Sequence, residues 1–302
     1  VVQTGDWLTV SKINEQLKLS ATENTVDAIR QATIHISAGG ESESITVIQE
    51  GSAPDFYTDK EVVKIQNATT GNGINIVLMG DGYTVKDMNK KNGKYEKDMR
   101  TATDHFFSVY PYTKYRDYFN VYMVTAISNE EGISIKSDNT LIDTKFESIW
   151  EGPHSTGINC NVYTVAEYVY MIHELSTVDI HDITVIMPIN AEIYAGTCSM
   201  HFPDYSNGYG EGFSISMCPV GSDFDRVVAH EVGGHGFAKV IDEYINYPKE
   251  TIPENEIEVV NKYKKWGWCE NIDFYSNITQ TSWNGFANHA KYNMVGTFEG
   301  AY

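Results

Sequence analysis

Basic side chains are scarce in this 302-residue sequence, which has 22 Lys and Arg against 41 Asp and Glu. The formal charge of −19 repels phosphate backbones and anionic lipid surfaces, so we expect no nucleic-acid partner. Long apolar runs are also missing, and none approaches the roughly eighteen residues that predict a membrane-spanning helix. No signal-like segment opens the chain at Val1. We therefore expect a mature or trimmed piece without a membrane span.

Cysteine is sparse as well. The four cysteines are Cys160, Cys198, Cys218 and Cys269, and no two of them form a Cys-x-x-Cys pair. Neither a zinc ribbon nor a thioredoxin-type redox pair is therefore indicated, whereas buried free thiols and one or two disulfides are both compatible with the sequence. What the chain does have is 41% hydrophobic residues, enough for a sizeable core in one large domain plus a small one.

The first fifty residues contain short stretches of alternating β-branched side chains. Two of them, ATIHIS at 32–37 and SITVIQ at 44–49, are separated by the turn residues Ala38, Gly39 and Gly40, which predicts a hairpin. We therefore predict a small all-β module over residues 1–52. The Gly, Ser, Pro and Asp content that follows is typical of a linker, which we place at residues 53–60.

Beyond residue 60, strand and helix patterns alternate along the chain. Apolar runs predict buried strands at 73–79, 118–128 and 181–190, and helical spacing predicts helices at 95–110 and 165–175. Such alternation favours a largely parallel sheet with crossover helices. A further stretch, GYGEGFSISM at 208–217, alternates polar and apolar residues and predicts an edge strand.

The stretch VVAHEVGGHGFAKVIDEY at 227–244 holds the strongest candidate for chemistry. It nearly matches the His-Glu-x-x-His motif of zinc proteases, but His235 comes five residues after His230 instead of four. On a regular helix, residues five apart lie ~140° apart, against ~40° for residues four apart. Gly233 and Gly234 fit poorly in a helix interior but tolerate a π-type turn. We therefore predict a π-bulge there that returns both imidazoles to one face.

Zinc then needs a third protein ligand, and Asp242 and Glu243 follow closely. Two histidines and a carboxylate leave one coordination position for water. Glu231 can accept the proton of that water and later protonate the leaving amine. From the spacing alone, a chance grouping of histidines near acidic residues stays open as an alternative.

Several stretches resemble the IgA peptidase family of zinc metallopeptidases. They are HEVGGHGFAKVIDEY at 230–244, MGDGYT at 79–84, PYTKYRDYFNVYMVTAIS at 111–128 and GTFEGAY at 296–302. The resemblance implies an α/β, zincin-like fold: a mixed, largely parallel twisted sheet above the metal-binding motif helix, with substrate extended along an edge strand.

Carried over by position, the resemblance implies His230, His235 and Asp242 as Zn²⁺ ligands and Glu231 as the general base. The metallopeptidase domain is expected to cover residues 61–302. Family members continue into a segment with a Met-containing turn beneath the metal, so we expect this domain to be truncated at its C-terminus.

Residues 1–52 are similar to the last strands of a BACON domain. The matching positions are Trp7, Val10, Ser11, Asn24, Arg30 and the stretch TVIQEG at 46–51. That family is an immunoglobulin-like sandwich on envelope enzymes of gut Bacteroidetes, which implies a partial sandwich here. It also implies a glycan contact or a spacer role, and a secreted or cell-envelope location.

Two functions follow. The leading hypothesis is a zinc-dependent endopeptidase that hydrolyses peptide bonds of an extracellular protein or glycoprotein through a zinc-activated water. The alternative is a glycan-binding or adhesion envelope protein with an inactive peptidase-like domain. The intact set of ligands with Glu231 favours the peptidase, because an inactive relative is expected to lose Glu231 or a ligand. The sequence does not indicate which protein is the substrate.

Overall fold

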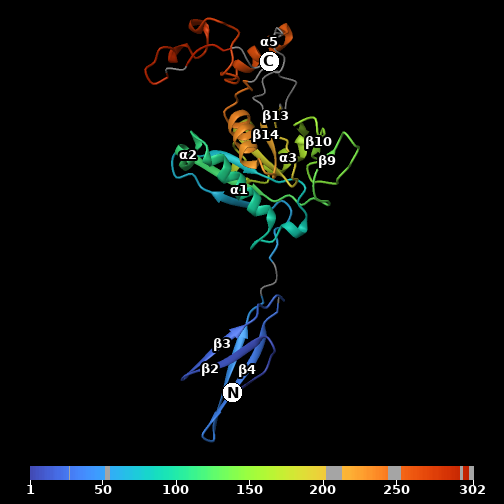
Figure 1. Cartoon of the computed structure of the whole chain (residues 1–302), viewed down its shortest axis with the longest axis vertical. Helices are drawn as coiled ribbons and strands as arrows, with labels where there is room; N and C mark the ends of the chain where they lie inside the picture. The colour runs from blue at the N-terminus through green and yellow to red at the C-terminus, as the bar shows by residue number, and fades with distance from the viewer. Residues whose placement is uncertain (27, 52–54, 202–212, 244–252, 293–294, 299–302) are drawn as a thin grey trace. The chain divides into compact units, whose positions relative to one another are not determined.

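The computed structural model divides into two compact units, Val1–Tyr57 with Asn89–Asn92 and Thr58–Met88 with Gly93–Tyr302. The structure (Figure 1) describes residues 1–26, 28–51, 55–201, 213–243, 253–292 and 295–298. Residues 53 and 54 of the predicted linker lie outside these ranges. Among the described helices, none combines the length and apolar character needed to cross a bilayer.

Short strands make up the first unit: β1 (Val2–Gln3), β2 (Leu8–Ile13), β3 (Gln16–Ala21), β4 (Arg30–Ala38) and β5 (Glu41–Gln49). Ala38 of β4 pairs with Glu41 of β5, so Gly39 and Gly40 form the two-residue turn of the predicted hairpin, which is confirmed. β1 extends this sheet, while β2 and β3 form a separate two-stranded sheet. A small core draws on both sheets and consists of Trp7, Leu8, Ala32 and Ile34.

The second unit is built on a six-stranded sheet with the order β13-β14-β12-β7-β8-β6. Its strands are β6 (Val62–Gln66), β7 (Ile74–Leu78), β8 (Phe119–Val124), β12 (Ile183–Ile189), β13 (Thr197–His201) and β14 (Phe213–Pro219). The four central strands are parallel and both edge strands are antiparallel, which confirms a mixed, largely parallel sheet. The prediction of an edge strand at 208–217 is wrong for its described part, because β13 pairs on the outer side of β14.

The second unit contains further short strands and helices. A small sheet contains β9 (Ser134–Ile135), β10 (Ile149–Trp150) and β11 (Ile158–Asn159). The α-helices are α1 (Lys94–Ser108), α2 (Tyr112–Tyr115), α3 (Val162–Val169), α4 (Phe224–Val227) and α5 (Glu254–Lys264). Short 3₁₀ helices are η1 (Val85–Asp87), η2 (Arg116–Tyr118), η3 (His173–Leu175), η4 (Ile180–Asp182), η6 (Ile278–Gln280) and η7 (Asn284–Phe286), and η5 (Val228–Phe237) is a π-helix.

Both faces of the main sheet are buried at its centre, since every residue of β12 is buried and successive residues of a strand point to opposite sides. On one face, Val185 and Met187 of β12 share a hydrophobic cluster with Val165 and Tyr168 of α3 and with residues of the small sheet. On the other face, α1 and η5 contact β12, and η5 also contacts β13 and β14. Helix η5 is thereby held against the β13 edge of the sheet.

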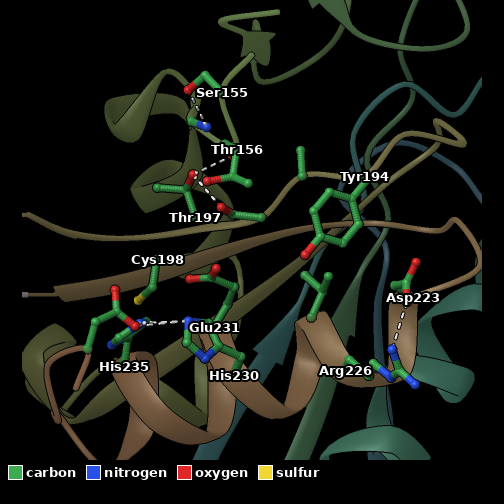
Figure 2. A pocket seen from close by; sticks show the side chains of 15 residues that line it. Ser155, Thr156, Tyr194, Thr197, Cys198, Asp223, Arg226, His230, Glu231 and His235 are labelled. Carbon is green, nitrogen blue, oxygen red and sulfur yellow. Dashed lines mark hydrogen bonds and ion pairs between the residues drawn. The ribbon is translucent and has the colours of Figure 1, made fainter. Parts of the chain in front are cut away.

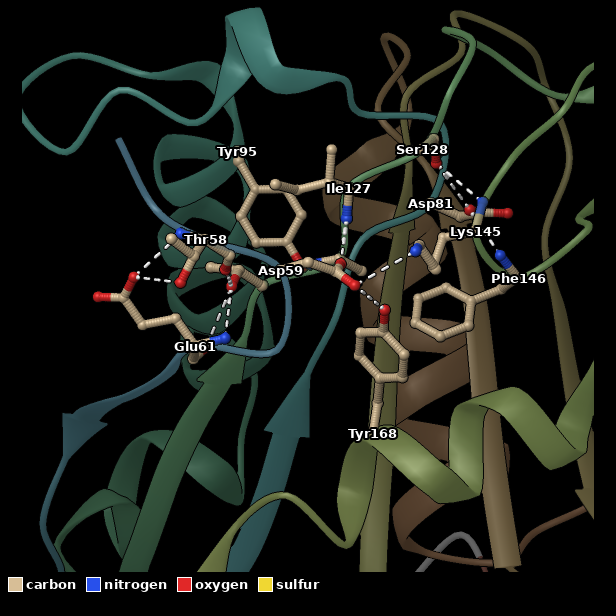
Figure 3. A network of polar contacts seen from close by, with 12 residues as sticks. Thr58, Asp59, Glu61, Asp81, Tyr95, Ile127, Ser128, Lys145, Phe146 and Tyr168 are labelled. Carbon is tan, nitrogen blue, oxygen red and sulfur yellow. Dashed lines mark hydrogen bonds and ion pairs between the residues drawn. The ribbon is translucent and has the colours of Figure 1, made fainter. Parts of the chain in front are cut away.

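A buried aspartate fastens the segment between β8 and α3 to the sheet (Figure 3). Asp81, directly beyond β7, is fully buried. It accepts hydrogen bonds from the Thr144 hydroxyl at 2.8 Å, from the backbone N–H groups of Phe146 and Ser148 at 3.0 and 3.1 Å, and from the Ser128 hydroxyl at 3.3 Å. These donors all lie within residues 128–148, between β8 and α3. This single carboxylate therefore holds that segment against the sheet.

Candidate metal centre

The motif helix is distorted as the histidine spacing predicts. Residues Val228–Phe237 form a π-helix, and the Ala238 N–H bonds to the carbonyl of Gly233, five residues earlier, at 3.2 Å. The predicted π-type distortion is confirmed, although it extends over ten residues instead of one turn. With i→i+5 hydrogen bonds, residues five apart lie on one face, as residues four apart do in an α-helix.

The structure gives different reasons for the glycines of this helix. A Cβ at Gly233 would lie 3.1 Å from the Tyr112 ring, whose hydroxyl donates to the Gly233 carbonyl at 2.5 Å. A Cβ at Gly236 would lie 2.7 Å from the Ser216 hydroxyl, closer than real Cβ contacts allow. A Cβ at Gly234 would meet only Val240, at 3.7 Å. Gly236 is therefore the most constrained of the three.

The π-helix brings the predicted ligands together. The Nε2 atoms of His230 and His235 lie 3.2 Å apart, and Asp242 Oδ1 lies 3.2 Å from the first and 3.3 Å from the second. The three atoms form a nearly equilateral triangle at the surface of the unit, with side chains that are 52%, 19% and 29% exposed, respectively. The three ligand atoms therefore lie close enough together to bind one metal ion.

The chemistry of these atoms fits a cation. His235 Nδ1 lies 2.6 Å from the Val240 carbonyl, so it carries the proton and leaves a lone pair on Nε2. Asp242 Oδ1 is buried and has no hydrogen-bond donor among the described residues. Lone pairs this close repel one another unless a cation lies between them. A tetrahedral ion with ligands at ~2.0–2.1 Å separates them by ~3.3–3.4 Å, which matches the triangle.

Glu231 lies beside this triangle in a different environment. Its side chain points from η5 toward β13, where the Cys198 N–H hydrogen-bonds the carboxylate (Figure 2). The residue is 9% exposed, and its burial raises the pKa of the carboxyl group despite the opposing effect of the two imidazoles. Gly196 allows this close approach, since a Cβ there would lie 3.1 Å from Glu231 Oε1. Burial therefore makes Glu231 a stronger base than an exposed glutamate.

The four residues share one cavity of about 810 Å³. Its walls come from the segment between β10 and β11, the start of β13, helices α4 and η5, and the loop after η5: Ser155, Thr156, Gly157, Tyr194, Ala195, Gly196, Thr197, Cys198, Asp223, Arg226, Val227, His230, Glu231, His235 and Asp242. The segment between β10 and β11 thus forms one wall of the cavity, and the edge strand β13 forms another.

Other candidates have different surroundings. The Glu243 carboxylate accepts a hydrogen bond from Asn271 Nδ2 at 2.9 Å instead of joining the triangle. All four cysteines are free thiols, and burial raises the pKa of Cys198 to about 11. The sequence reasoning missed Asn271, which no motif marks.

Comparison with known families decides the classification. A family model described as IgA peptidase M64 matches residues 63–294, more than half of the chain. The chain belongs to the IgA peptidase M64 family. A second model, BACON, described as a putative N-terminal binding domain, matches residues 2–50. No curated protein matches the chain. Both resemblances found in the sequence are confirmed, and the M64 match makes the chain a peptidase, that is, a hydrolase.

Proposed function

We propose that the chain is a zinc-dependent endopeptidase that cleaves an extracellular protein or glycoprotein. One observation carries the proposal. The lone-pair atoms of His230, His235 and Asp242 converge within 3.3 Å, next to a buried Glu231 in the same cavity. The membership of the M64 peptidase family supports the reaction class. Zinc, when bound, would polarise the scissile carbonyl and lower the pKa of a coordinated water.

The residues of the chain would supply the rest of the chemistry. Glu231 would accept the proton of the attacking water at its carboxylate, and its raised pKa suits it to hold that proton. It would then transfer the proton to the nitrogen of the leaving amine. The Cys198 N–H hydrogen-bonds this carboxylate, which is not among the three grouped ligand atoms and so stays available for proton transfer.

The edge strand β13 supports an extended substrate. Its residues Thr197 and Cys198 line the cavity, and among the described strands β13 pairs only with β14. A peptide lying beside β13 could therefore add to the sheet through backbone hydrogen bonds and bring its scissile bond to the cavity. We propose this orientation for an unfolded or loop segment of the substrate protein.

The first unit belongs to the proposal only as an accessory. Its match to a putative binding domain favours a glycan contact or a spacer, and with it a secreted or cell-envelope location. The alternative function, an adhesion protein with an inactive peptidase-like domain, predicts a defective site. The complete set of His230, Glu231, His235 and Asp242 favours the peptidase.

Replacing Glu231 with glutamine tests the proposal, because the amide keeps the shape but cannot accept a proton. Glu231→Gln should keep its zinc, which elemental analysis measures. The rate at which new peptide termini form in a protein mixture should fall by about 10²–10⁴-fold. Glu167→Gln, at an exposed glutamate of α3 that does not line the cavity, is the control and should keep both properties. A Glu231→Gln variant as active as the parent would refute the base assignment, and a parent that binds zinc without cleaving would favour the adhesion function.

A further inference from the structure

The ligand Asp242 lies on a segment without regular secondary structure. Helix η5 ends at Phe237, and residues 239–243 belong to no helix or strand. Lys239 adopts a φ of +59°, a conformation that residues other than glycine rarely adopt. Main-chain hydrogen bonds of a helix or strand therefore do not fix the position of Asp242, although its carboxylate must meet two imidazoles within a few tenths of an ångström.

Asn271 supplies what the backbone of this segment lacks. Its carboxamide oxygen accepts the N–H of Ile241 at 3.0 Å, and its Nδ2 donates to the Ile241 carbonyl at 2.8 Å. The same Nδ2 donates to Glu243 Oε1 at 2.9 Å. One side chain thus holds both main-chain groups of the residue before Asp242 and the side chain of the residue after it.

The surroundings of Asn271 make this contact a rigid one. Two residues earlier, the Cys269 N–H donates to the Lys239 carbonyl at 2.9 Å. Ile241 packs against the hydrophobic cluster of Val260, Trp268 and Cys269. The segment before Asp242 is therefore held at both ends by residues that come about thirty positions later in the chain.

We propose that Asn271 is a positioning residue that places the Asp242 carboxylate for metal binding. The inference rests on the proposed metal site. The role requires an amide, because Asn271 donates to two oxygen atoms and accepts from one N–H. A carboxylate of the same shape would face the Ile241 carbonyl and the Glu243 carboxylate without a proton to donate, and it would push the segment away.

The test is the zinc affinity of Asn271→Asp, measured on the full chain by competition with a chelator. Residues that support a metal ligand typically contribute ~10–100-fold to metal affinity, so we expect a loss of that size. Asn120→Asp is the matched control, since Asn120 makes similar amide contacts, with Ala68 and Asn75. Asn271→Ala, which adds no charge, serves as a second variant in case the aspartate prevents folding.

Co²⁺ in place of zinc gives a second readout, because its visible absorption reports the ligand geometry. The inference predicts an altered Co²⁺ spectrum in the Asn271 variants, with the parent spectrum in Asn120→Asp. Parent affinity in both Asn271 variants would overturn it, as would an equal loss in the Asn120 control, which would show that affinity follows general stability. A parent chain that binds no zinc would overturn the proposed metal site together with this inference.

Discussion

Replacing Gly236 with alanine tests how closely helix η5 must approach the sheet. The new Cβ would lie 2.7 Å from the Ser216 hydroxyl, which donates to the Glu231 carbonyl at 3.0 Å. The helix must then move away from β14, and this buried hydrogen bond is lost with it. Overpacking costs about 1–3 kcal/mol and the hydrogen bond about 1 kcal/mol, against a gain in helix propensity of up to ~1 kcal/mol. We expect a net loss of ~1–3 kcal/mol in the free energy of unfolding.

Calorimetry of the metal-free chain checks this value, since a unit of this size loses roughly 2–4 °C in Tm per kcal/mol. Gly234→Ala is the control and should unfold at or slightly above the parent temperature, because its Cβ would meet only Val240, at 3.7 Å. Ser216→Ala removes the clashing oxygen, so Gly236→Ala should cost less in that background. Equal Tm values for Gly236→Ala and Gly234→Ala would refute the reasoning.

Two further predictions concern residues 239–243, which carry Asp242, and the residues around Asn271 that hold them. Asp242→Ala should lower zinc affinity more than the ~10–100-fold typical of a supporting residue, whereas Glu243→Ala should stay within tenfold of the parent in the same chelator competition; the reverse order would exchange their roles. Burial raises the pKa of Asp273, but backbone hydrogen bonds and Lys264 outweigh it, so the pKa lies below its ordinary value. This contribution to stability is complete above the unfolded pKa of ~4 and is lost as the pH falls through the lower folded pKa. Asp273→Asn should thus flatten the acid decline of Tm, and an unchanged decline would contradict this.

Features that depend on local sequence patterns could be predicted from the sequence. The parallel strands follow from apolar runs, and the π-helix follows from the spacing of His230 and His235 together with the paired glycines. The position of Asp242 rested on a family resemblance, because the spacing alone does not distinguish it from Glu243. The structure separates them, since Asp242 faces the imidazoles and Glu243 faces an amide.

Contacts between distant segments were beyond prediction. The β14 strand has the alternating pattern of an edge strand, but its Ser216 faces the motif helix, where a small side chain lets η5 come close. Only the pairing with β13 shows that β14 is an inner strand. Asn271 carries no motif, and its role depends on hydrogen bonds to Ile241, thirty residues earlier.

The order of residues along the chain has a consequence for biosynthesis. Ribosomes make His230, Glu231, His235 and Asp242 before Asn271 and Trp268, and every strand of the main sheet is made earlier still. A nascent chain that ends shortly after Asp242 therefore holds all the ligand atoms but not the side chain that fastens their loop. If Asn271 positions Asp242 as proposed, the growing chain reaches its full zinc affinity only after Asn271 has been made, when all the described strands of the main sheet are already available to fold.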